Sequence, residues 1–260
     1  MLQAPDEVLP AFESLLADDD PWVRALARLH LGKMRIVLGQ GGRDADAYLE
    51  MAVAEFRALG ERWGISFAQT ELAGRIATRG EFAAASEHYE QAIAVATELG
   101  AIDDVVQWRS RQAQLYWLLG DEESSTAAMA EAQRYAERVV WPSALAALAL
   151  AKAELARWSG DTEQAFRQLD LATAMLGDEA EQALFRAMTH DLLGYLADGL
   201  DEARDHRVVA FQAATEAGHP SLIAHVLVGV ADLALRRGQF EQAARLLAAS
   251  ASLRGLPDRS

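Results

Sequence analysis

Histidines are the side chains in this sequence that are best suited to bind a transition metal, and the chain has six of them: His30, His88, His190, His206, His219 and His225. Two ligands on one helix face usually stand three or four residues apart, as in the HExxH pattern. No two of these histidines have a spacing of four, and cysteine is absent. His219 and His225 are six residues apart across Pro220, so they do not share a helix face. We therefore expect no metal site.

Carboxylate clusters and one glycine-rich segment are the other patterns that could do chemistry. The acidic clusters at 18–20, 103–104 and 121–123 each precede or open a predicted helix, where negative charge stabilises the helix N-terminus. A general acid needs a cleft that raises its pKa, and these clusters fall in predicted exposed bends. The GQGG segment at 39–42 follows a predicted helix and lacks the Gly-Lys-Ser/Thr of a phosphate loop. We expect helix capping and a bend, no catalytic residue, no cofactor and no enzymatic activity.

Tryptophans and amides combine on two predicted helices. Trp117 follows Gln114 by three residues and Gln107 by ten, which places all three on one helix face. Glu154 and Trp158 are four residues apart on a later helix. Aromatic and polar groups on one face can grip a peptide or a flat small molecule by stacking and hydrogen bonds. An ordinary solvated face is the alternative.

The charge balance restricts the partners. The 260 residues carry a formal net charge of −15, and the only lysines are Lys33 and Lys152. Because contact with phosphates needs a local positive surface, we expect no direct binding of nucleic acid and no binding to a membrane surface. The start, MLQAPDEVLP, lacks the features of a signal peptide, and no apolar run has the length of a membrane span. We expect a cytoplasmic protein with a cationic or neutral ligand.

The elements that position these residues are predicted by a spacing of small and large side chains. In TRGEFAAASEHYEQAIAVATELG, Gly80 is followed by an acidic residue, an aromatic residue, and then Ala85, Tyr89 and Ala92 at helical spacing. Glycine lets one helix end and another begin, while small residues allow the two helices to approach closely. The segment therefore predicts a helical hairpin that bends at Gly80.

The same spacing returns along the chain, with bends 38 to 40 residues apart. The matching sets are Ser125, Met129 and Ala132; Ala165, Leu169 and Ala172; Ala243, Leu247 and Ser250; and Ala47, Met51 and Ala54. The weakest copy has Ala203 and Ala210, with Arg207 in the large position. A repeat of this length is typical of a solenoid, in which stacked neighbours bury each hairpin's apolar face. We predict an all-α solenoid of about six hairpins after one leading helix around residues 6–17.

The pattern of glycine, acidic residue, aromatic residue and small–large–small side chains resembles the tetratricopeptide repeat (TPR). This resemblance covers nearly the whole chain and implies a right-handed superhelix, with residues 1–260 forming one domain and residues 1–19 the leading helix of an incomplete repeat. HEAT-like repeats have a similar period, but their bends do not characteristically carry this pattern. In TPR arrays the first helix of each hairpin lines the concave face. The resemblance therefore implies a groove with these residues: Gln107, Ser110, Gln114, Trp117, Glu154, Arg157, Trp158, Tyr195, His225 and Asp232.

A narrower resemblance concerns residues 61–100 and 243–260. Both segments look like the C-terminal helical repeats of large actinobacterial transcriptional activators, of the SARP type and of the LuxR type with a signalling ATPase module. This implies a sensor or interaction region of a longer regulator, since no DNA-binding domain or nucleotide-binding loop is present in the sequence. We expect a non-enzymatic module that binds a protein, peptide or small effector, and a homodimer is compatible with it. The alternatives are a stand-alone scaffold or peptide-pheromone receptor, and an enzyme built on a helical solenoid.

Overall fold

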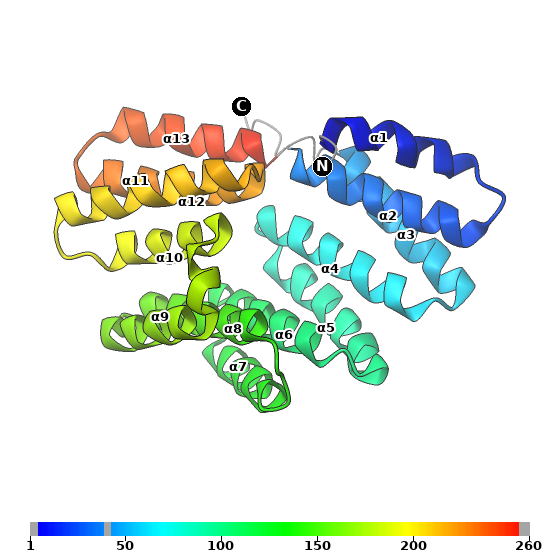
Figure 1. Ribbon diagram of the computed structural model, residues 1–260, viewed down its shortest axis with the longest axis horizontal. Coiled ribbons are helices and arrows are strands. Elements are labelled where there is room, and N and C mark those ends of the chain that lie inside the picture. The colour runs from blue at the N-terminus through cyan, green and yellow to red at the C-terminus, as the bar shows by residue number, and fades with distance from the viewer. Residues whose placement is uncertain (1–4, 39–42, 255–260) are drawn as a thin grey trace. The chain divides into compact units, whose positions relative to one another are not determined.

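The structure is a computed structural model that describes residues 5–38 and 43–254. This part of the chain contains thirteen α-helices, two short 3-10 helices and no strand. The chain divides into two compact units, Met1–Ala144 and Leu145–Ser260, with the boundary in the first turn of helix α8. Figure 1 shows the helices of both units with their labels. The predicted all-α helical-repeat fold is confirmed.

The first unit consists of a leading helix and three helical hairpins. Helix α1 packs against α2, and the hairpins pair α2 with α3, α4 with α5, and α6 with α7. Neighbouring hairpins also touch, through α3 with α4 and α5 with α6. The bounds are α1 Pro5–Ser14, a 3-10 turn Leu15–Ala17, α2 Pro21–Val37, α3 Arg43–Leu59, α4 Arg62–Thr78, α5 Phe82–Leu99, α6 Ile102–Leu118 and α7 Glu122–Ala136.

The second unit adds three more hairpins. Helices α8 and α9 share one buried cluster with α10, and α10 pairs with α11 and α12 with α13. The bounds are α8 Pro142–Ser159, α9 Thr162–Leu176, a 3-10 segment Gly177–Glu181, α10 Ala183–Leu196, α11 Leu200–Ala217, α12 Pro220–Arg236 and α13 Phe240–Leu253. The described residues thus hold the leading helix and six hairpins that the bend spacing predicts.

Helix ends follow the capping rules that the sequence suggests. The Asp20 carboxylate accepts the Trp22 backbone N–H at 2.8 Å, and Pro21 occupies the first helical position. The Asp121 carboxylate accepts the Ser124 N–H at 3.0 Å at the start of α7. At Gly120 the hairpin turns through a left-handed φ of 78°, which an L side chain rarely adopts. The predicted capping role is confirmed for the acidic clusters at 18–20 and 121–123.

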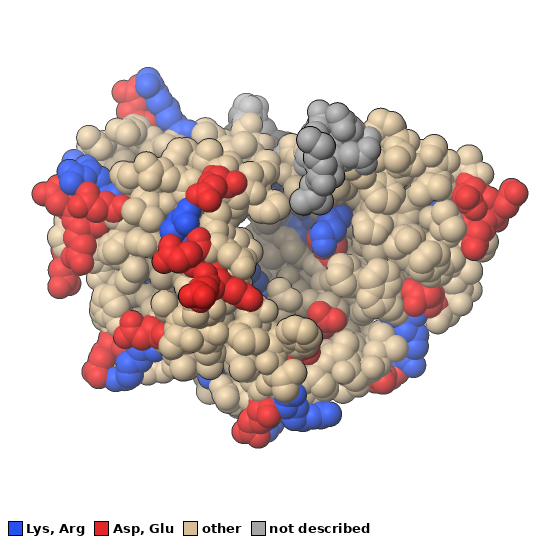
Figure 2. Space-filling model, viewed as in Figure 1, with Lys and Arg blue, Asp and Glu red and all other residues tan. Residues whose placement is uncertain are grey.

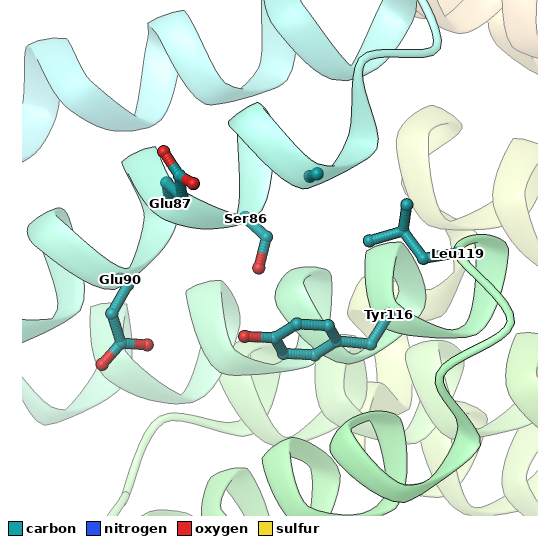
Figure 3. Close-up of a pocket in the computed structure, with 6 residues that line it drawn as sticks. Ser86, Glu87, Glu90, Tyr116 and Leu119 are labelled. Atoms are coloured by element: carbon teal, nitrogen blue, oxygen red, sulfur yellow. The ribbon is translucent and has the colours of Figure 1, made fainter.

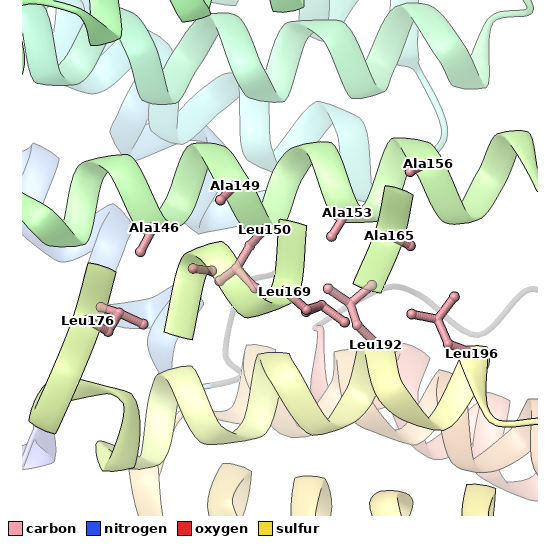
Figure 4. Close-up of a cluster of buried hydrophobic side chains, with 11 residues drawn as sticks. Ala146, Ala149, Leu150, Ala153, Ala156, Ala165, Leu169, Leu176, Leu192 and Leu196 are labelled. Atoms are coloured by element: carbon pink, nitrogen blue, oxygen red, sulfur yellow. The ribbon is translucent and has the colours of Figure 1, made fainter. Parts of the chain in front are cut away.

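The core is built from the predicted small–large–small sets. In α5, Ala85, Tyr89 and Ala92 are buried. In α9, Ala165, Leu169 and Ala172 are buried among alanine and leucine side chains of α8 and α10 (Figure 4). Small side chains at these positions let helix backbones approach, and the large side chain fills the remaining space.

The predicted register of the first repeat is wrong. In α3 the predicted set of Ala47, Met51 and Ala54 is exposed, and the buried set is Ala45, Leu49 and Ala52. The two sets lie two positions apart, about 200° around a helix, and both satisfy the small–large–small spacing. The pattern of residue types therefore could not discriminate between the two faces. The GQGG segment that set the predicted register lies outside the described residues.

Two later repeats also depart from the pattern. Leu247 of α13 is 44% exposed, although Ala243 and Ser250 beside it are buried. Helix α13 belongs to the last hairpin of the described residues, so the large position of its repeat has no following hairpin to cover it. At the weakest repeat, Gly199 has a φ of −101° and stands at the N-cap of α11, where other bends use a left-handed glycine. The prediction of one domain over residues 1–260 stays a prediction.

Candidate binding site

Three first helices of the second unit bring predicted groove residues together. Arg157 of α8 places its guanidinium 4.2 Å from the ring centroid of Tyr195, which belongs to α10. Asp232 of α12 is close enough to Tyr195 to act on its hydroxyl electrostatically. We call this surface the α8–α10–α12 face. The first and last of these three helices begin nearly 80 residues apart in the sequence, and the repeat places the helices in chain order.

Arg207 contacts this face from its buried side. It lies in α11 and is 2% exposed, and its guanidinium stands 3.9 Å from the Tyr195 ring centroid. The guanidinium passes close to Gly194 of α10 and Gly229 of α12, where a Cβ atom would collide with it. These two glycines therefore make the space through which an α11 side chain reaches the first helices.

Asp191 of α10 joins Arg207 to the surface. Its carboxylate is 2% exposed and forms an ion pair with Arg207, whose Nη1 also donates to the Asp191 backbone carbonyl at 2.7 Å. The second carboxylate oxygen lies 3.3 Å from His225 Nε2, and the His225 side chain is 62% exposed. The buried ion pair thus ends in an imidazole that faces solvent.

The environment of Tyr195 keeps its hydroxyl neutral. Burial raises the pKa of Tyr195 to about 12, with further increases from the charges of Asp191 and Asp232 and opposing effects from Arg207 and Arg157. A neutral phenol can both donate and accept a hydrogen bond. Tyr195 is therefore a constant hydrogen-bonding group at ordinary pH, flanked on its ring by two guanidiniums.

The remaining predicted residues of α8 surround Arg157. Glu154 accepts a hydrogen bond from Arg157 Nη2 at 2.7 Å, which fixes the guanidinium over Tyr195. The ring centroid of Trp158 lies 5.8 Å from the same guanidinium. All six predicted groove residues of the second unit are thus on the three first helices, and four of them share direct contacts.

The other four predicted groove residues lie in α6 of the first unit. Gln107 is exposed and Trp117 is half-buried. Ser110 is buried, and its hydroxyl donates to the Val106 carbonyl at 2.7 Å. Gln114 is nearly buried and accepts from Arg111 Nη1 at 3.2 Å. The hydroxyl of Ser110 and the side-chain oxygen of Gln114 are thus engaged within α6, and the candidate site lies on the second unit.

Two residues of the network were missed by sequence reasoning, Asp191 and Arg207. Arg207 carried a signal, because it occupies the position where other repeats have a large apolar side chain. A charged residue at a buried position needs a partner. The partner could not be found from spacing, since Asp191 is sixteen residues away on the preceding helix.

A shallow depression in the first unit is the other candidate. It has a volume of about 290 Å³ and is lined by Ala83, Ser86, Glu87, Glu90, Tyr116 and Leu119. Figure 3 shows the Tyr116 hydroxyl directed between Ser86 and Glu90, with the Glu87 carboxylate turned away. Glu90 is already bonded to Arg109, which lowers the Glu90 pKa, and it accepts Gln112 Nε2 at 3.1 Å. The Glu90 carboxylate at this hollow therefore ties α5 to α6.

Charge is mixed on the surface of the molecule. On the face that Figure 2 shows, blue basic side chains lie beside red acidic ones, and no continuous basic area is visible. Within the described residues, no group of three or more His, Asp or Glu side chains could hold a metal ion. No helix among them is long and apolar enough to cross a membrane.

Comparisons with known proteins place the fold. No protein family and no curated protein sequence match the chain. Among solved structures, RapI in its apo form is 16% identical, with a TM-score of 0.69, over 97% of this chain and 92% of that chain. A Rap protein in complex with competence and sporulation factor is 15% identical, with a TM-score of 0.77, over 96% of this chain and 69% of that chain.

A third similar structure comes from Pyrococcus horikoshii. It is a signal transduction ATPase with numerous domains (STAND) that has a tetratricopeptide repeat sensor, and it is 12% identical with a TM-score of 0.56. The match covers 95% of this chain and 38% of that one. At these identities the likeness concerns the backbone fold. The chain has a TPR-like helical-repeat fold.

Proposed function

We propose that this chain is a non-enzymatic binding module that holds a peptide segment of a partner on the α8–α10–α12 face. The observation that carries the proposal is the contact of Arg157 with the Tyr195 ring, beside the acidic Asp232. Three successive first helices thereby present a cation, an aromatic hydroxyl and a carboxylate in a row. A row of this kind matches an extended peptide, which has regularly spaced polar groups.

The charges of the face favour a peptide with a basic residue. Arg157 is already paired with Glu154, and Arg207 is paired with Asp191. Asp232 has no hydrogen bond or ion pair among the described residues, although its charge acts on Tyr195. Its carboxylate is therefore the group that remains for a cationic side chain, and Trp158 offers a nearby ring for stacking. The net charge of −15 attracts the same class of ligand.

The similar structures support a peptide over a small effector. One of them holds competence and sporulation factor, and another Rap protein, a conjugation gene regulator of the plasmid pLS20, is in complex with the Phr* peptide. Both cover most of this chain. Since the identities are 15% and 12%, they support the choice of ligand class and do not assign individual contacts.

For the biological setting, we propose the sensor or interaction region of a cytoplasmic transcriptional regulator. The resemblance of residues 61–100 and 243–260 to SARP-type and LuxR-type activators motivates this, and the TPR sensor of the STAND ATPase supports it. Ligand binding would be passed to other domains of the regulator, and this chain would contact neither nucleic acid nor membrane. A stand-alone peptide-pheromone receptor is the alternative, favoured by the likeness to RapI, of which the chain covers 92%.

The test is a selection of random peptides on the immobilised chain, followed by calorimetric titration of the enriched peptides. We expect enrichment of peptides with Arg or Lys and a loss of affinity of at least about tenfold in each of Arg157→Ala and Asp232→Asn. Asp232→Asn removes the carboxylate that meets the cationic side chain, and Arg157→Ala removes the guanidinium that lies on the Tyr195 ring. The melting temperature of each variant shows whether its fold is intact.

Arg167→Ala is the matched control. Arg167 lies on α9 and is exposed, and its partners among the described residues are side chains of its own helix. It should bind the selected peptides as the wild type does. The proposal is overturned when no peptide is enriched, or when Arg157→Ala binds as tightly as Arg167→Ala.

A further inference from the structure

Two histidines that are far apart in sequence meet at the α10–α11 hairpin. His190 of α10 and His206 of α11 have their ring centroids 5.1 Å apart, with an angle of 48° between the ring planes. Their Nδ1 atoms are 3.0 Å apart. Both rings are partly exposed, so the pair is accessible from solvent. The α8–α10–α12 face does not include these rings.

We propose that His190 and His206 form a binding site for one transition-metal ion, coordinated through the two Nδ1 atoms. Metal–imidazole bonds have a length of about 2.0–2.1 Å. With such bonds, two nitrogens 3.0 Å apart enclose an angle of about 90–95° at the metal. A tetrahedral ion would need a separation of about 3.3 Å. The spacing therefore fits the cis positions of a tetragonal Cu²⁺ or Ni²⁺ ion more closely than a tetrahedral Zn²⁺ ion.

The short contact between the two rings leaves the imidazoles available as ligands. Nδ1 atoms 3.0 Å apart need one N–H donor and one lone-pair acceptor, so at least one of the two Nδ1 atoms is unprotonated. A neutral imidazole has a lone pair to donate, whereas an imidazolium has none. In the metal-free pair one Nδ1–H donates to the other Nδ1. Metal binding needs that proton to move to Nε2 of the same ring. It also needs the rings to turn, since the metal lies well off the Nδ1–Nδ1 line of the hydrogen bond, and χ2 is a soft torsion that allows this turn.

Charges of both signs lie near the pair. Arg186 is a positive charge near His190, but it forms an ion pair with Glu216 and donates to the Glu181 carbonyl at 2.7 Å. The Glu181 carboxylate acts on His190 as a nearby negative charge. With two protein ligands, the remaining coordination positions belong to water.

The site is placed to act on the binding face. His190 and His206 directly precede Asp191 and Arg207, which form the buried ion pair behind Tyr195. A metal ion that joins α10 to α11 would fix the helices that carry this ion pair. Because the two nitrogens meet only in the folded hairpin, the ion should also stabilise the folded state.

The experiment adds Cu²⁺, Ni²⁺ or Zn²⁺ alone to the full chain after removal of metals. Electron paramagnetic resonance of the Cu²⁺ form should show two equatorial imidazole nitrogens at one equivalent of metal. Calorimetry should rank Cu²⁺ and Ni²⁺ above Zn²⁺. In His190→Ala and His206→Ala the Cu²⁺ affinity should fall by at least about tenfold, because one of two ligands is lost.

His219→Ala is the control, since His219 is exposed at the N-cap of α12 and should leave the affinity unchanged. A Cu²⁺ signal with fewer than two imidazole nitrogens in the wild type would overturn the proposal, and this readout needs no variant to fold. An equal loss of affinity in His219→Ala, or unchanged binding in the double variant His190→Ala/His206→Ala, would overturn it as well.

Discussion

At the scale of single residues, the buried side chain of Arg207 links the residues of the candidate site in the second unit. Arg207 occupies a position that is apolar in the neighbouring repeats, and it is buried against Asp191 and Tyr195. Two of its nitrogens, Nε and Nη2, have no hydrogen-bond partner among the described residues. The ring of Tyr195 faces the guanidinium and offsets part of that cost through a cation–π contact. The Arg207–Asp191 pair therefore positions Tyr195 and His225, while the unpaired guanidinium nitrogens reduce the stability of the folded state.

The buried ion pair predicts how the stability of the chain changes when one or both of its charges are removed. Asp191→Ala leaves Arg207 buried without its counter-ion and should destabilise the chain by about 3–5 kcal/mol. The double variant Asp191→Leu/Arg207→Met removes both charges, so its unfolding free energy should fall by less than that of Asp191→Ala. Urea unfolding measures the unfolding free energy of each variant. A double variant that is destabilised by the sum of the effects of Asp191→Leu alone and Arg207→Met alone would contradict this account of the ion pair.

Half-buried histidines predict a loss of stability in mild acid. Partial burial lowers the pKa of His88 and of His190 from the ordinary value of 6.5. The unfolded chain then binds more protons than the folded chain once the pH falls below about 6.5. Unfolding free energy should therefore decrease between pH 7.5 and 5.5, and less so in His88→Gln. The measurement is urea unfolding at several pH values with EDTA present. The exposed-site variant His219→Gln should keep the wild-type dependence of unfolding free energy on pH. An unchanged pH dependence in His88→Gln would count against the prediction.

At the scale of helices, the hairpins were predictable because each depends on local spacing. Ala73 and Ile76 of α4 share a buried cluster with Ala85, Tyr89 and Ala92 of α5 within forty residues of chain. The caps lie within three residues of the groups that they satisfy. Register was harder to predict. In α3 two sets of small and large side chains run in parallel, and burial selected the set that begins at Ala45.

The register in α5 can be tested by overpacking. Ala85 is fully buried in a cluster with α4 and α6, so Ala85→Leu should cost about 1–3 kcal/mol. Ala94 is exposed on the same helix, and Ala94→Leu should change stability by less than about 0.5 kcal/mol. Thermal unfolding compares the two. Equal melting temperatures would show that the small-residue position of this repeat is misplaced.

At the scale of the whole molecule, the sequence placed the candidate site on first helices and did not predict the contacts among its side chains. The order of first helices follows from the repeat, so the first helices α8, α10 and α12 were expected to present Arg157, Tyr195 and Asp232. The links to Asp191 and Arg207 join residues on different helices and need the packed structure. The pairing of His190 with His206 was missed for the same reason, since ligand spacing along one helix was the only guide.

The central claim is that the α8–α10–α12 face binds a peptide, and a crystal structure of the chain with a selected peptide tests it most directly. We predict that the peptide lies along this face, with a basic side chain on Asp232 and a backbone group hydrogen-bonded to the Tyr195 hydroxyl. Arg157 should remain over the Tyr195 ring. A peptide seated on α9, α11 or α13, or only on the first unit, would contradict the claim.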